Sequence, residues 1–279
     1  MDRRITWCVL AGVAIVLTIF ATVPASNQSD GEIRRIGIPD GSAGLLARYV
    51  LQEKLGSPAV QTVRFEPYTV YDCCASTTQY ALGSAHLDLA IMCPDAARAL
   101  VAKDTRFEII GPVMINSDVL ITLPNVDLQQ PTIGISEKRA FQRKMVAERF
   151  GESGRAAPMM HTAVPFAYAR GVIQGAILDI TKVLHLDGDL EVAAARKQRI
   201  CTYVLVSKKA LKNKEQYTLF LEKYGQAVEE MDDPHNLLRL LRTYESPNIS
   251  MGDVLKWQKM NVHFINPLHS PHRNLTWCN

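Results

Sequence analysis

Three cysteines occupy positions where thiols could act as ligands. Cys73 and Cys74 are adjacent in the stretch "YDCCAS", and Cys93 stands in "MCPDAA". A cysteine thiolate is a soft ligand that selects soft metals. Cysteines also form disulfides or serve as small buried side chains. The residue types therefore leave three roles open: soft-metal ligands, disulfide partners and core filler.

The neighbouring residues predict that all three thiols stand at the beginning of helices. Residues 87–92 are a short apolar run of strand length, and Pro94 suits the first position of a following helix. A second helix is expected from Cys73 to Leu82, ended by Gly83. Because the carboxyl ends of neighbouring strands meet at one sheet edge, the thiols are expected to face one cleft. A helix N-terminus also stabilises the thiolate, which is the form that binds metal.

Two turns and one histidine are further candidate contacts. Asp40, Gly41 and Ser42 follow the expected strand 33–39, and Ser136 follows a second expected strand, 132–135. Turns between a strand and a helix offer backbone N–H groups to anions, although ordinary helix capping by Ser136 explains that serine equally well. His161 ends an expected strand in the second half of the chain, on the cleft side.

The other cysteines and histidines fit structural roles better. Cys201 lies inside a strongly β-prone run and is predicted to be buried filler. His269, His272 and Cys278 lie near the C-terminus, where we expect a solvated tail in preference to a metal site.

The elements that must position these residues alternate between strand and helix. The alternation begins at residue 33 and predicts a parallel-dominated sheet flanked by helices. Residues 107–122 form a long apolar stretch that we interpret as a crossing between two lobes, after which the pattern restarts. We predict lobe 1 from residues 31–116 and 199–279, and an inserted lobe 2 from residues 120–196. The two crossings form a hinge, and the cleft between the lobes is the expected ligand site.

The N-terminus predicts export. Arg3 and Arg4 precede an apolar run from Ile5 to Val23, and small residues follow near Ala25. This pattern is typical of a secretory signal peptide over residues 1–25, with an uncleaved N-terminal anchor as the alternative. Of six cysteines, Cys8 lies in this segment and five remain, so one thiol at least is unpaired within the chain.

Bulk composition narrows the functional classes. The chain has 279 residues with 47% hydrophobic and 21% charged content, enough for a substantial core. The net charge of +3 and the lack of a basic run argue against nucleic-acid binding. The sequence contains no nucleophile elbow, phosphate-binding loop or zinc-protease motif, so we expect no enzyme.

The segment "ALGSAHLDLAIMCPDAA" and the later "VSKKAL" resemble type II periplasmic substrate-binding proteins of ABC transporters. The order of predicted elements fits that family over nearly the whole exported chain. The resemblance implies a monomeric receptor in the periplasm or at the outer face of the cytoplasmic membrane. Its implied partners are a permease and an ATPase, with membrane contact only through the permease or the N-terminal segment.

A narrower resemblance rests on "YDCCAS" and "MCPDAA". These stretches are similar to the substrate-binding component of selenocysteine-assisted organometal transport systems, although this chain has cysteine at both paired positions. The resemblance implies a soft-metal or organomercury ligand held by Cys73, Cys74 and Cys93, with no resident cofactor. Two alternatives stay open: a receptor for a small organic anion (sulfonate, nitrate or pyrimidine-like) with structural cysteines, or a thiol-dependent enzyme or redox relay.

Overall fold

The computed structural model describes residues 34–56, 65–70, 86–126, 129–193 and 199–268. The predicted signal peptide or anchor, the predicted helix carrying Cys73 and Cys74, and the tail with His269, His272 and Cys278 lie outside these residues. Within the described residues, no helix is long and apolar enough to cross a membrane.

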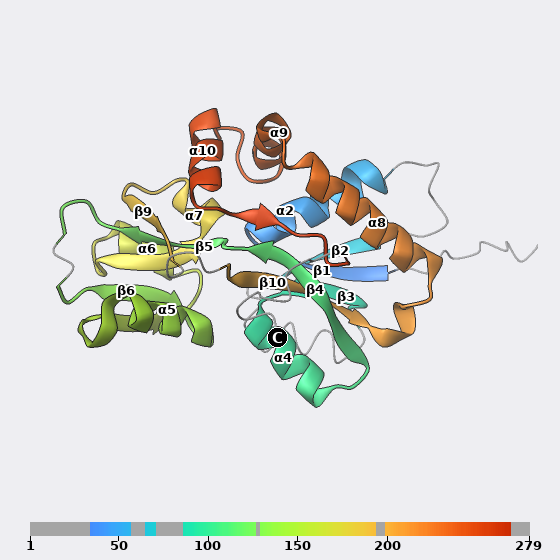
Figure 1. Cartoon of the computed structure of the whole chain (residues 1–279), viewed down its shortest axis with the longest axis horizontal. Helices are drawn as coiled ribbons and strands as arrows, with labels where there is room; N and C mark the ends of the chain where they lie inside the picture. The colour runs from blue at the N-terminus through green and yellow to red at the C-terminus, as the bar shows by residue number, and fades with distance from the viewer. Residues whose placement is uncertain (1–33, 57–64, 71–85, 127–128, 194–198, 269–279) are drawn as a thin grey trace, which may run out of the picture.

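The chain forms two β-sheets, each covered by helices (Figure 1). Sheet A has the order β11-β4-β10-β3-β1-β2, and sheet B has the order β7-β6-β8-β5-β9. The strands of sheet A are β1 Arg34–Pro39, β2 Phe65–Val70, β3 Leu89–Met92, β4 Phe107–Ile115, β10 Cys201–Lys208 and β11 His263–Phe264. Those of sheet B are β5 Asp118–Thr122, β6 Thr132–Ser136, β7 Arg155–Met159, β8 Gly175–Asp179 and β9 Asp189–Val192. We call the part built on sheet A lobe 1 and the part built on sheet B lobe 2.

Helices cover both sheets, and most of them belong to lobe 1. Lobe 1 carries α2 Ser42–Tyr49, which continues as the π-helical η1 Val50–Lys54, then α4 Pro94–Lys103, η4 Lys209–Leu211, α8 Glu215–Glu230, α9 Pro234–Tyr244 and α10 Met251–Lys259. Lobe 2 carries α5 Ala140–Phe150, η3 Gly151–Ser153, α6 Val164–Ala169 and α7 Ile180–Val183. The predicted two-lobe α/β fold is therefore confirmed.

The strand directions differ in part from the expectation. In each sheet three strands pair in parallel, namely β1, β2 and β3 in sheet A and β6, β7 and β8 in sheet B. The remaining strands pair antiparallel. The antiparallel strands include β4, β5 and β10, which carry the chain from lobe 1 to lobe 2 and back. Both sheets are mixed rather than parallel-dominated.

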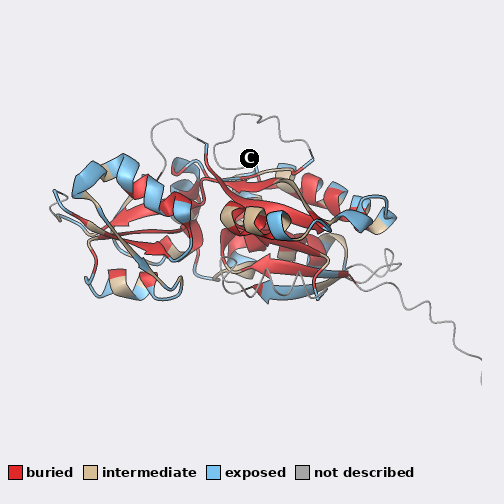
Figure 2. Ribbon diagram, turned by 90° about the horizontal axis from the view of Figure 1, so that it is seen from below, coloured by how far each residue is buried: buried red, intermediate tan, exposed pale blue. Residues whose placement is uncertain are grey.

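The hydrophobic core of each lobe lies between its sheet and the covering helices. Figure 2 shows this as buried strands, in red, under helices whose outer faces are exposed. In lobe 1, β3 is buried along its whole length, as a strand covered on both faces must be. In lobe 2, Ile133, Ile135 and Phe141 are buried in a separate cluster.

Local sequence signals set several element ends as predicted. Cys93 is the N-cap residue of α4 and Pro94 occupies its first turn. Ser250 and Asp253 form a capping box at α10. The predicted strand 132–135 is confirmed as β6.

One local prediction was wrong. Ser136 does not cap α5, which begins at Ala140 with Arg139 as N-cap residue. The backbone instead turns through Lys138, which has a positive φ of 60°, before the helix starts. Strand β2, over Phe65–Val70, pairs with β1 along its whole length.

Candidate functional site

The first strand–helix turn of lobe 1 holds a carboxylate from lobe 2. The Ser42 backbone N–H donates to Asp179 Oδ1 at 3.0 Å, and the Ser42 hydroxyl donates to Asp179 Oδ2 at 2.6 Å. Ser42 is the first residue of α2, so its N–H belongs to the helix N-terminus that favours negative charge. The Ser42 N–H, which we expected to be open to a ligand, is therefore taken by Asp179 in this conformation.

Asp179 is held in place by its own lobe. It is the N-cap residue of α7, and its Oδ1 accepts from the Thr181 backbone N–H at 3.0 Å and from the Thr181 hydroxyl at 2.9 Å. Asp179, Ser42 and Thr181 are all buried. One carboxylate thus joins the ends of two helices, one from each lobe.

Gly41 makes this approach possible. Its φ of +101° and ψ of −163° lie in a region that residues with a Cβ avoid. A Cβ at this position would lie 3.1 Å from both Cγ and Oδ1 of Asp179. The predicted turn Asp40–Gly41–Ser42 therefore lies at the lobe junction, but it contacts the protein itself.

A second contact between the lobes is ionic. Lys182 Nζ of α7 lies 3.3 Å from Asp40 Oδ1 and 3.9 Å from Glu245 Oε1, both in lobe 1. Burial raises the pKa of Glu245; Lys182 opposes this rise, and the negative charges of Asp179 and Asp40 add to it. The junction is thus acidic around Asp179.

The most deeply buried ion pair lies next to this contact. Asp118 at the start of β5 and Arg139 before α5 pair through Oδ1–Nη1 at 3.2 Å and Oδ2–Nη2 at 3.0 Å. Arg139 also donates to the Thr202 carbonyl of β10 and stacks on Phe141 and Tyr203. Burial raises the pKa of Asp118 to about 6, with the attraction of Arg139 opposing the rise and Asp179 and Cys93 adding to it. The pair ties β5, α5 and the returning strand together.

The corresponding turn of lobe 2 is also satisfied internally. The Ser136 backbone N–H donates to Gln142 Oε1 at 2.8 Å, and Ser136 Oγ lies 3.1 Å from His161 Nδ1. Ser136 and Gln142 are buried. The structure therefore brings the predicted residues Ser136 and His161 together.

Cys93 lies at the junction but faces inward. Its side chain is fully buried in the hydrophobic core. It is near enough to Asp118 of lobe 2 for their charges to interact. This burial weakens the hypothesis of direct metal capture in the conformation described, because a ligand must reach the sulfur.

The other cysteines add one correction. Cys201, predicted to be filler, is buried at the start of β10 but is disulfide-bonded, with its partner outside the described residues. Cys73 and Cys74 also lie outside the described residues. Within the described part of the chain, no three Cys, His, Asp or Glu side chains form a group that could hold a metal ion.

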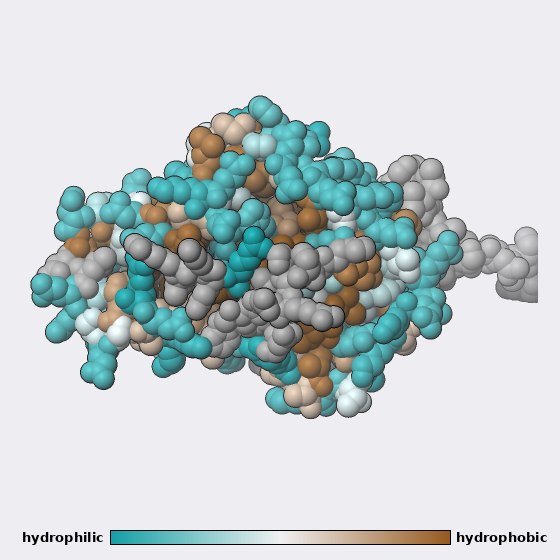
Figure 3. Space-filling model, in the orientation of Figure 1, coloured by the Kyte–Doolittle hydropathy of each residue, from teal (hydrophilic) through white to brown (hydrophobic). Residues whose placement is uncertain are grey.

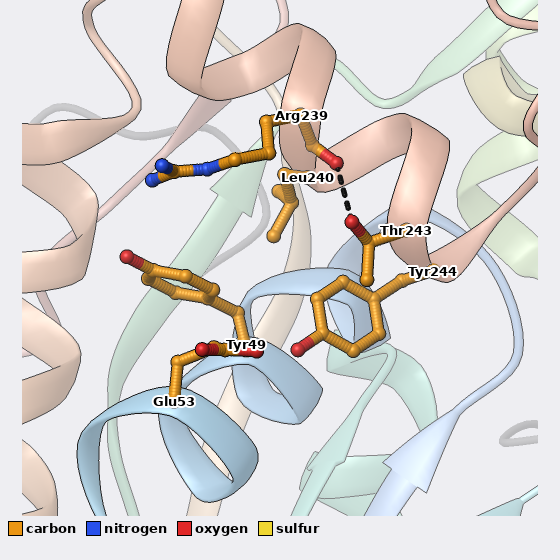
Figure 4. A pocket seen from close by; sticks show the side chains of 6 residues that line it. All are labelled: Tyr49, Glu53, Arg239, Leu240, Thr243 and Tyr244. Carbon is orange, nitrogen blue, oxygen red and sulfur yellow. Dashed lines mark hydrogen bonds between the residues drawn. The ribbon is translucent and has the colours of Figure 1, made fainter.

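A surface pocket lies away from the junction. It measures about 180 Å³ and lies between α2–η1 and α9, both in lobe 1 (Figure 4). Tyr49 and Glu53 line it from α2–η1 and Tyr244 lines it from α9, where the Thr243 hydroxyl donates to the Arg239 carbonyl at 2.9 Å. No residue that the sequence singled out lines this pocket, so it is not a candidate for the predicted site.

Comparison with known proteins assigns the fold. No family model and no curated protein matches the chain. A solved structure of the ligand-binding component of an ABC-type import system from Staphylococcus aureus, with zinc bound, is similar at a TM-score of 0.64 and 12% identity, covering 86% of this chain and 87% of that one. The alkanesulfonate-binding protein from Xanthomonas axonopodis pv. citri bound to MOPS is similar at 0.63 and 12%, covering 84% and 86%. The methionine-binding protein MetQ is similar at 0.56 and 12%, covering 76% and 96%.

These proteins are binding components, and the chain shares their two-lobe fold. At 12% identity the similarity establishes the fold alone. It does not support the narrower organomercury resemblance.

Sequence reasoning missed Asp179, Asp118 and Arg139. Asp179 is 137 positions from its partner Ser42, and Asp118 pairs with Arg139 from a different element of lobe 2. One local signal was present. Asp179 followed by Ile180 and Thr181 is a strong N-cap pattern at the end of an apolar strand.

Proposed function

We propose that the protein is the substrate-binding component of an ABC import system, exported to the periplasm or to the outer face of the cytoplasmic membrane. The observation that carries this proposal is the pair of α/β lobes joined by β4–β5 and β10, an arrangement shared with import-system binding components over 84–86% of this chain. The protein would bind a ligand between its lobes, act as a monomer and deliver the ligand to a permease and its ATPase.

We further propose that the ligand is a soft-metal or organometal species bound by Cys73, Cys74 and Cys93. Support comes from Cys93, the N-cap residue of α4, which lies near enough to Asp118 of lobe 2 for their charges to interact. Because Asp118 of lobe 2 lies nearby, separation of the lobes would uncover this region. Soft thiolates at a helix N-terminus suit such a ligand.

A small organic anion bound at the strand–helix turns is the weaker candidate. The Ser42 N–H is taken by Asp179 and the Ser136 N–H by Gln142. An anion would have to displace internal acceptors in both lobes. The thiol-dependent enzyme has no feature in the described residues that favours it.

Retention of phenylmercury against a competing thiol tests the ligand proposal. Any single exposed thiol binds mercury, so reduced protein is loaded with phenylmercury and dialysed against excess glutathione. We expect the wild type to keep about one equivalent, and both Cys73→Ser/Cys74→Ser and Cys93→Ser to lose it at least tenfold more readily, which is about 1.4 kcal/mol. Cys278→Ser, which also removes one thiol, is the matched control and should behave as the wild type.

Two results would contradict the proposal. Equal retention by the wild type and by both cleft variants would show that these thiols do not form the site. Catalytic release of benzene from phenylmercury would instead favour the thiol-dependent enzyme.

A further inference from the structure

We propose that Asp179 determines ligand specificity by acting as an internal anion: its carboxylate fills the anion-binding turn of lobe 1 and excludes anionic ligands from it. The inference deepens the proposed function and rests on it, because it concerns the class of ligand that the cleft accepts. Its physical basis is the set of contacts at the N-terminus of α2.

The turn has the donors that an oxoanion needs. The Ser42 backbone N–H and hydroxyl point at two oxygens of one carboxylate, 3.0 and 2.6 Å away. They stand at the start of α2, an eight-residue helix that continues into η1, so its dipole adds to the attraction for negative charge. Gly41, with no Cβ, leaves room for the carboxylate 3.1 Å from the position that a Cβ would occupy.

Asp179, the residue that fills the turn, comes from lobe 2 and is held in place by hydrogen bonds within that lobe. Asp179 caps α7 and accepts two further hydrogen bonds from Thr181. An anionic ligand would have to displace a carboxylate that receives four hydrogen bonds from buried groups. Such charge-assisted bonds are about twice as strong as neutral ones.

The surroundings add repulsion. Asp118 and Glu245 both interact electrostatically with Asp179, and Asp40 stands beside the same turn. Figure 3 shows hydrophilic side chains over much of the described surface on this side of the molecule. An incoming anion would therefore come close to these carboxylates. Their repulsion would be strong because solvent and salt screen buried charges least. A neutral or cationic ligand would not meet this repulsion.

Removal of the carboxylate should create an anion site. In Asp179→Ala, the Ser42 N–H and hydroxyl lose their acceptor, and formate has the size of the missing group. We expect sodium formate to bind this variant at least about tenfold tighter than the wild type in calorimetric titrations at constant ionic strength. Methanesulfonate, a larger oxoanion, serves as the second probe.

Two matched variants test whether formate affinity rises because the turn at Ser42 is empty or only because the Asp179 charge is lost. Asp179→Asn keeps the turn filled by a neutral side chain of the same shape, so formate should bind it no better than the wild type. In Asp179→Ala/Ser42→Ala one donor is lost, and the gain in formate affinity should fall by about tenfold. If Asp179→Ala is too unstable to titrate, formate should raise its Tm and leave that of Asp179→Asn unchanged.

The inference would be overturned if formate bound Asp179→Ala no better than the wild type and did not raise its Tm. It would also be overturned if the Ser42→Ala change left a gain in affinity intact. Neither outcome affects the receptor role, since phenylmercury retention is measured separately. Loss of phenylmercury retention would likewise leave the formate result standing.

Discussion

At the scale of single residues, Gly41 is the position where backbone conformation and the lobe contact depend on each other. Its positive φ is needed for the turn between β1 and α2, and its missing side chain leaves space for Asp179. Two separate costs would therefore follow from adding a methyl group: backbone strain and collision with the carboxylate.

Gly41→Ala should lower the free energy of unfolding by about 1–3 kcal/mol from backbone strain, with the contact to Asp179 adding to it. Gly171 is the matched control, because it also has a positive φ, +68°, but an added Cβ would meet nothing within 4 Å. Urea titrations of Gly41→Ala and Gly171→Ala should show the larger loss for Gly41. Equal losses would mean that the Asp179 contact does not constrain this position.

At the scale of elements, sequence patterns were reliable where a signal was local. The position of Cys93 at the beginning of α4 and that of Pro94 in its first turn were both predicted from adjacent residues. Capping depends on groups within one helical turn, so neighbouring residue types determine it.

The rest of the site could not be predicted because it depends on distant partners. Ser42 has the same local sequence whether its N–H meets a ligand or Asp179. Only the placement of α7 of lobe 2 against α2 decides between them. Ser136 likewise ends β6 and does not cap α5. Its backbone N–H donates to the side chain of Gln142, six positions further along the chain.

Removal of Arg139 should make the free energy of unfolding depend more strongly on pH, through Asp118. In the wild type the folded-state pKa of Asp118 is raised to about 6. The stabilisation that comes from protonated Asp118 is therefore fully present below the pKa of the unfolded state and is lost as the pH rises through 6. Arg139→Met removes the charge that lowers this pKa and leaves Asp118 buried alone. We expect a loss of about 3–5 kcal/mol at pH 8 and a smaller loss at pH 5, where Asp118 is largely protonated in both proteins.

Urea titrations at the two pH values measure this difference. Asp118→Asn/Arg139→Met, which has no charge at either position, is the control and should show no extra loss between pH 5 and pH 8. A loss for Arg139→Met that is the same at both pH values would mean that Asp118 is not the group responsible.

At the scale of the whole molecule, the two crossings form a polar hinge beside the junction. Asn116 between β4 and β5 accepts from the Ile200 N–H at 2.9 Å and donates to the Asn261 carbonyl at 3.1 Å. Ser117 and Thr202 join their hydroxyls at 2.8 Å. These bonds hold the two crossings together, so the contacts of Asp179 and Lys182 are among those that would change when the lobes separate.

Asp179→Ala should therefore shift the molecule toward a more open shape. It removes two hydrogen bonds between the lobes, each worth about 1 kcal/mol net, so the closed fraction should fall by about tenfold or more relative to the open one. Small-angle X-ray scattering should give a larger radius of gyration than for the wild type. Lys182→Ala, which removes a partly exposed ion pair, should have a smaller effect in the same direction.

Lys144→Ala is the control for this measurement, because its ion pair with Glu148 lies within α5 and joins nothing across the junction. Formate gives a second comparison. It can fill the turn at Ser42 in Asp179→Ala, but a free anion is not attached to α7, so the variant should stay open while it binds formate. Scattering curves that coincide for the wild type and Asp179→Ala would show that the Asp179–Ser42 contact does not hold the lobes together.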